Sequence, residues 1–179
     1  MKTRRLLIIT FTLLLWATAS LAQESEIEGV EAAGDESWKI LRGLPGIGIV
    51  VEDIHLTAEK DGLRREAILS TVELELRRAG IRVLSEEELF STFRRAFLYV
   101  EVYAVKNNSG FYAYSVQVGV MEAVSMFSEP FMGTLGRTWN TNSSIGITTV
   151  REIRRKAEGR VVDMVRDFAI KFLRANATN

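Results

Sequence analysis

The stretch FLYVEVYAVKNNSGFYAYSVQVGV, residues 97–120, decides the fold of this chain. Apolar and polar side chains alternate on both sides of a short break, NNSG, at residues 107–110. Strict alternation is typical of a strand with one buried face, and two such runs joined by turn residues predict an antiparallel hairpin. The second run keeps its pattern toward Met126, so we expect a long strand that contains a bulge.

The two faces of this predicted hairpin differ in chemistry. One face is aliphatic, with Leu98, Val100, Val102, Val116 and Val118. The opposite face is aromatic and polar, with Tyr99, Glu101, Tyr103, Ser115 and Gln117. We expect helices to cover the aliphatic face. The other face is then open, either as a solvated surface with ordinary cross-strand pairs or as a binding surface for a protein or glycan.

Two stretches predict the long helices that would form the second layer. Apolar side chains recur at helical spacing through residues 63–79, and Gly80 is a natural C-terminal cap. A longer apolar stripe follows residues 149–152, TVRE, which match a capping box. A further capping box at residues 85–88 predicts a short helix, with Ser85 as the cap.

Residues 43–55, GLPGIGIVVEDIH, place three glycines and a proline before an apolar run. A dinucleotide-binding loop has its glycines after a strand and before a helix, and no phosphate-loop Gly-Lys-Ser/Thr occurs here. We therefore expect no nucleotide cofactor. We interpret residues 47–56 as a central buried strand, which the helix at 63–79 and a short strand at 81–84 extend into a right-handed β-α-β unit.

The residues that most resemble a catalytic group are Glu52, Asp53 and His55, at the end of that strand. Alternation would place Asp53 beside His55, the only histidine, as an acid that orients a base. One histidine and two acids form no recognisable metal site, and no Gly-x-Ser-x-Gly elbow is present. The sequence favours a strand end that emerges into solvent over a catalytic site.

Residues 134–142, TLGRTWNTN, predict one further strand at an edge of the sheet, after Pro130 ends the preceding one. Trp139 in this stretch is interpreted in two ways. It is either a binding group at the sheet edge or a lid that packs on the core.

The first 22 residues read as a secretory signal peptide, with a basic start, a short apolar run and small residues before Gln23. We place cleavage after Ala22 and expect a periplasmic or secreted protein without a stable membrane anchor. Residues 23–37 are acidic and form an expected linker to a single domain at 38–179. The chain has no cysteine, which excludes disulfides and a lipid anchor at the new amino terminus.

The charge balance argues against nucleic acid as a partner. The chain has 23 basic and 23 acidic residues, and loss of the basic signal peptide would leave it mildly acidic. An aromatic open sheet face is similar in kind to platforms that stack RNA bases, but those surfaces are basic. A protein partner is the better interpretation.

Five stretches carry a resemblance to known proteins: LRGLPGIGIVVEDI, GLRREAILSTVELELRRAGIRVLSEEE, LYVEVYAV, FYAYSVQV and VREIRRKAEGRVVDMVRDFAIKFL. Together they resemble a family of small exported bacterial proteins, which supplies no catalytic residue. The fold looks like the α/β modules of bacterial envelope systems, such as the amino-terminal domain of the Tol-Pal propeller protein and the curli-secretion lipoprotein. That resemblance implies binding of protein partners, often along a sheet edge. This chain departs from both in having no lipidation cysteine and no propeller.

The sequence therefore predicts an α/β two-layer sandwich, a mixed sheet of four to six strands with two long helices on one face. We expect a non-enzymatic module that binds envelope proteins through Tyr99, Glu101, Tyr103, Gln117 and Trp139. The alternatives are a hydrolase-like enzyme that uses Glu52, Asp53 and His55, and a small-molecule carrier. No metal or other cofactor is expected, and the oligomeric state is left open.

Overall fold

The computed structural model describes residues 36–126 and 132–177. The signal peptide, almost all of the acidic linker and Pro130 lie outside the described residues. Within them, five strands form one mixed sheet: β1 (Gly48–Val51), β2 (Phe97–Lys106), β3 (Phe111–Met126), β4 (Met132–Asn140) and β5 (Ser144–Thr149).

The sheet is built around the predicted hairpin. β2 and β3 pair antiparallel from Phe97 opposite Met121 to Lys106 opposite Tyr112. β1 adds to the outer edge of β2 in parallel, while β4 and β5 share the other edge of β3. The register of β3 with β4 shifts between Val120 and Met121, where Thr138 is the extra residue, so the bulge expected in the long strand lies on its partner β4 instead.

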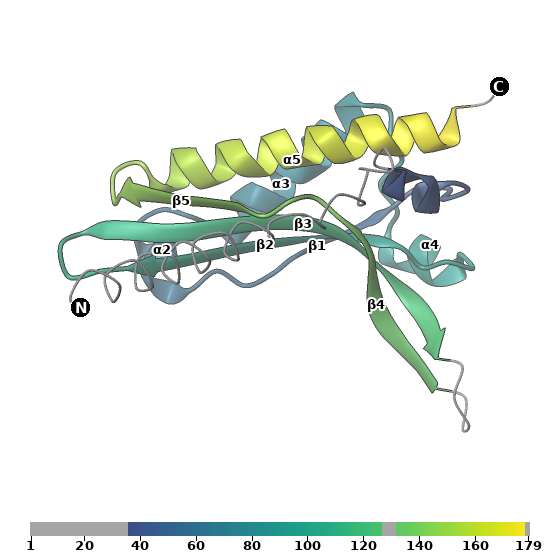
Figure 1. Cartoon of the computed structure of the whole chain (residues 1–179), viewed down its shortest axis with the longest axis horizontal. Coiled ribbons are helices and arrows are strands. Elements are labelled where there is room, and N and C mark those ends of the chain that lie inside the picture. The colour runs from purple at the N-terminus through teal and green to yellow at the C-terminus, as the bar shows by residue number, and fades with distance from the viewer. Residues whose placement is uncertain (1–35, 127–131, 178–179) are drawn as a thin grey trace, which may run out of the picture. The chain divides into compact units, whose positions relative to one another are not determined.

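Two long helices, α3 (Arg65–Arg78) and α5 (Ile153–Asn176), cover one face of the sheet (Figure 1). The shorter elements are η1 (Ser37–Leu41), α2 (Leu56–Lys60) and α4 (Glu86–Ser91). This arrangement confirms the predicted two-layer α/β fold with two long helices on one face of a mixed sheet.

The core lies between the helix layer and the aliphatic face of the sheet. Its sheet side is made by Leu98, Val100, Val102, Val116 and Val118, all buried. Its helix side is made by Ile68, Val72, Leu76, Val161, Val165 and Phe168. Full burial of each such side chain contributes about 1.5–3 kcal/mol relative to exposure, which fixes which face of the hairpin the helices cover.

Two local signals in the sequence are confirmed at the helix ends. Gly80 has φ +77° directly after α3, the left-handed conformation that ends many helices. Ser85 accepts a hydrogen bond from the Glu88 backbone N–H, and the Glu88 carboxylate accepts one from the Ser85 N–H. The capping box at the start of α4 is therefore complete.

The predicted central strand at residues 47–56 is wrong in both length and position. β1 spans only Gly48–Val51, and among the described strands it lies at the edge, paired with β2 alone. The chain leaves the sheet after Glu52, and His55 then caps α2. The short strand expected at 81–84 is reduced to a single parallel bridge between Ile47 and Val83.

The capping box expected at residues 149–152 is also wrong. Thr149 is the last residue of β5, where it lies opposite Phe111, and α5 begins only at Ile153. Glu152 precedes the helix without a side-chain cap. β5 itself was not predicted, and its last residue, Thr149, was assigned to the capping box of the last helix.

None of the helices in the described part of the chain combines the length and apolar character needed to cross a bilayer.

Candidate functional site

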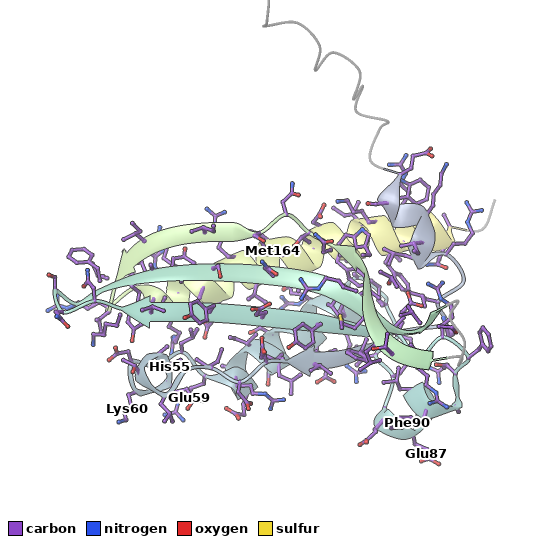
Figure 2. All side chains as sticks on the ribbon, turned by 60° about the horizontal axis from the view of Figure 1, so that its bottom comes forward. His55, Glu59, Lys60, Glu87, Phe90 and Met164 are labelled. Carbon is purple, nitrogen blue, oxygen red and sulfur yellow. The ribbon has the colours of Figure 1, made fainter. Side chains whose placement is uncertain are left out.

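Within the described residues, no helix covers the face of the sheet opposite α3 and α5 (Figure 2). Strand pairing aligns the side chains of this open face in rows. Tyr103 lies opposite Ser115, which lies opposite Ile145 on the next strand. The neighbouring row joins Val105, Ala113 and Ile147. These rows bring β2, β3 and β5 together on one surface.

An apolar patch occupies the end of the open face near the hairpin turn. It consists of Tyr103, Val105, Phe111, Ile145 and Ile147. The two isoleucines are 81% and 79% exposed, and Tyr103 is 60% exposed. Large apolar side chains rarely gather uncovered on a soluble surface, and contiguous patches mark interaction sites. The patch is therefore the strongest candidate site on this domain.

A polar network lies beside the apolar patch on the same face. Arg137 Nη1 donates to Gln117 Oε1 at 2.9 Å, and Arg137 Nη2 lies 3.8 Å from Glu101 Oε2. The same guanidinium lies 5.9 Å from the centre of the Tyr99 ring. Gln117 in turn donates to Ser143 Oγ at 2.7 Å. These side chains satisfy one another, so the network holds the shape of the face.

Tyr99 is the aromatic residue of this polar network, and its side chain is half-buried. Burial raises the pKa of its hydroxyl, and a hydrogen bond with Glu52 raises it further. The phenol therefore stays neutral across the physiological range. This contact pairs Glu52, one of the predicted catalytic candidates, with Tyr99.

The other two catalytic candidates have separate partners. Asp53 lies 3.5 Å from Arg65 Nε, and its carboxylate is almost fully exposed. His55 Nδ1 accepts a hydrogen bond from the Thr57 N–H at 3.3 Å, which makes it the cap of α2. Among the described residues no hydrogen bond or ion pair joins Asp53 to His55, so the expected acid–base pair does not form.

A hollow of about 260 Å³ lies between α2 and the end of β2, lined by His55, Thr57, Tyr103, Ala104, Val105 and Lys106. The lysine is already paired, since its Nζ lies 2.9 Å from Asp61 Oδ2. Tyr112 donates to the same carboxylate oxygen at 2.7 Å. The bond from Tyr112 and then the one from Lys106 hold the pKa of Asp61 below its usual value. Lys106 in the lining of the hollow is therefore already paired with an acid whose pKa is lowered, and His55, also in the lining, uses Nδ1 to cap α2.

Trp139 is buried at 3% exposure, and its ring packs 5.4 Å from that of Phe168 on α5. Its side chain points into the core and is not available to a partner on the open face. Of the two interpretations, packing on the core fits its position.

The described residues contain no group of three or more His, Cys, Asp or Glu side chains suited to hold a metal ion. No family model matches the chain, and neither a curated protein nor a solved structure matches it.

Sequence reasoning located Tyr103, Tyr99, Glu101 and Gln117 on the open face. It missed Val105, Phe111, Ile145 and Ile147, which form most of the apolar patch. The signal for the isoleucines was present as a short alternation in SSIGITT, residues 143–149. Two apolar positions are too few to distinguish a strand from a polar connection.

Proposed function

We propose that this chain is a non-enzymatic module that binds an envelope protein through the open face of its sheet. The observation that carries the proposal is the apolar patch, whose isoleucines are both about four-fifths exposed. Burying such side chains is favourable at roughly 25 cal/mol per Å² of apolar surface, which makes the patch a source of binding energy.

The arrangement of the face resembles that of a protein interface. An apolar centre lies beside a polar region whose members are already bonded to each other, as between Arg137 and Gln117. Protein interfaces commonly combine an apolar core with a polar rim. Small-molecule sites are concave, and although Tyr103 and Val105 also line the hollow beside α2, the two most exposed members of the patch, Ile145 and Ile147, do not.

The location is part of the same proposal. Residues 1–22 have the composition of a signal peptide, so the partner is expected in the periplasm or outside the cell. The separate partners of Asp53 and His55 support a binding role over the hydrolase-like alternative.

Photocrosslinking in intact exporting cells tests the proposal. A photoreactive residue replaces Tyr103, which is 60% exposed, and a matched control replaces Ile170 on α5, which is 67% exposed on the helix layer. We expect a discrete adduct from position 103 and none of the same size from position 170. No adduct at 103, or the same adduct from both positions, would contradict binding through the open face.

The His55→Ala variant distinguishes the binding proposal from the enzyme alternative. We expect it to lose only the cap of α2 and to keep the Tyr103 adduct and the cellular phenotype. Loss of the phenotype with an unchanged unfolding curve would favour a catalytic role for His55.

A further inference from the structure

β5 is an edge strand whose outward backbone groups can be assigned from its pairing with β3. The Val150 N–H donates to Gly110 O at 3.3 Å, and the Thr141 N–H donates to Val118 O at 2.8 Å. Even-numbered residues of β3 therefore turn their backbone groups toward this edge. In an antiparallel ladder the hydrogen-bonded pairs alternate, so Gly146 and Thr148, which lie opposite even-numbered residues, take the inner bonds.

Ile145 and Ile147 consequently direct their N–H and C=O groups away from the sheet. Their side chains stand on the open face at 81% and 79% exposure. The same two residues thus offer backbone hydrogen bonds at the edge and apolar surface on the face. Both are accessible at once.

This edge lacks the features that normally prevent strands from pairing. Natural edge strands are protected by charged residues, prolines or bulges. Residues 144–149, SIGITT, contain no charged residue and no proline, and they pair with β3 without a register shift. Two identical copies of this strand can approach each other without like-charge repulsion.

We infer that β5 pairs antiparallel with β5 of a second copy of this chain. The two-fold axis passes between the two copies of Gly146, which face each other. In this register Ile145 lies opposite Ile147 of the second copy, and Ile147 lies opposite its Ile145. Each of these two pairs exchanges backbone hydrogen bonds. A register centred on Ile147 would instead place Ile145 opposite Thr149 and leave it less covered. The contact is the same on both copies, so it closes as a dimer.

The dimer goes beyond the proposed binding of an envelope protein, because it uses the backbone edge of β5 and leaves the open face uncovered. The apolar patches of the two copies become neighbours across the axis. A partner protein would then meet one enlarged face.

Disulfide trapping tests the pairing and its register, because the chain has no cysteine of its own. Residues in a hydrogen-bonded pair have Cα atoms about 5.5 Å apart, within the range that a disulfide spans. Identical positions, such as 145 and 145, would lie about 8 Å apart in this register, which is too far. On mild oxidation, a mixture of Ile145→Cys and Ile147→Cys should form several-fold more linked dimer than either variant alone.

Sedimentation velocity over a concentration series tests association without crosslinking. The exported, processed chain should form dimers, and so should Ile147→Val, which keeps the N–H and most of the side chain. Ile147→Pro removes an outward N–H, which an edge strand tolerates, together with the isoleucine side chain, and should shift the population to monomer with its circular dichroism spectrum unchanged.

Three outcomes would overturn the inference. They are a monomeric wild-type chain, an Ile147→Pro variant that still dimerises, and equal disulfide yields in the mixture and in the single variants. The cysteine result decides the matter if the proline variant does not fold. If the chain is monomeric and still gives the Tyr103 adduct, a second copy is excluded as the occupant of the β5 edge, while the partner-binding proposal stands. The same conclusion follows if an acidic segment of the chain is found paired with β5.

Discussion

Arg94 and Glu122 are joined by two hydrogen bonds across the fold, from Nε to Oε2 at 2.7 Å and from Nη2 to Oε1 at 2.8 Å. Arg94 also donates to the carbonyl oxygens of Ile40 and Arg42, both at 2.8 Å. Glu122 accepts a further bond from Thr138 Oγ1 at 2.7 Å. This one pair connects the segment before β1 with β3 and β4.

Glu122→Ala is expected to lower the free energy of unfolding by about 3 kcal/mol. The Glu122 side chain is only 6% exposed, and its removal leaves Arg94 partly buried without its counter-charge. Urea denaturation at neutral pH measures the change. The matched control is Glu152→Ala, which removes an exposed partner of Arg155 and should cost less than about 0.5 kcal/mol. Equal losses of unfolding free energy in the two variants would contradict a larger contribution from the buried pair.

We expect the folded chain to lose stability in alkali because the Tyr112 hydroxyl ionises. Burial, together with the hydrogen bond to Asp61, raises the pKa of Tyr112 to about 12 from its ordinary value of 10. Because the folded pKa lies above the unfolded one, the stabilisation is full below about pH 10 and is lost as the pH rises toward 12.

Tyr112→Phe should cost about 1–2 kcal/mol near pH 8, since the ring stays but its bonds to Asp61 and to the Thr57 carbonyl are lost. The difference between wild type and this variant should shrink between pH 10 and 12. Denaturation curves at several pH values measure it, with Tyr103→Phe on the exposed face as the control. A difference that stays constant with pH would rule out the titration of Tyr112 as the cause.

We expect the folded chain to lose stability in acid because the Glu75 carboxylate becomes protonated. Its hydrogen bond with Arg166 lowers its pKa most, and the bond with Arg78 adds to this against the opposing effect of burial. Because the folded pKa lies below the unfolded value of about 4.3, the stabilisation is present above that pH and is lost as the pH falls through the folded pKa. Glu75 Oε2 accepts from Arg166 Nε at 2.7 Å, so protonation weakens the link between α3 and α5.

Glu75→Gln should be less stable than wild type at pH 7 and should approach it below pH 4. Thermal unfolding between pH 3 and pH 7 measures this convergence. Glu73→Gln, which affects an exposed pair with Arg77 on the same helix, is the control. Parallel acid profiles for wild type and Glu75→Gln would contradict the prediction.

The parts of the fold that the sequence predicted are those set by local chemistry. Alternation fixed the two faces of β2 and β3, and the positive φ at Gly80 and the cap at Ser85 follow from nearby residues. Tyr103 could be placed on the open face for the same reason. Each of these features needs only a few neighbouring residues to be recognised.

The features that the sequence did not predict depend on residues far apart in the chain. Thr149 resembles a helix cap beside Glu152, but its pairing with Phe111 makes it part of β5. Trp139 is apolar enough for either a surface or a core position, and its contact with Phe168 decides the matter. The exposure of Ile145 likewise follows from its position on an edge strand, which no local pattern fixes.

Two glycines in contrasting surroundings give the last prediction. A Cβ added to Gly146 would lie 2.8 Å from the ring of Tyr114, a buried side chain, whereas one added to Gly159 would meet nothing within 4 Å. Gly146→Ala should therefore cost about 1–3 kcal/mol through overpacking beneath β5. Gly159 lies inside α5, so Gly159→Ala should instead stabilise the chain by about 0.5–1 kcal/mol by reducing the freedom of the unfolded state. Thermal and urea unfolding of the two variants measures the sign of the change in unfolding free energy for each. A stabilised Gly146→Ala variant would mean that Tyr114 can move away from β5.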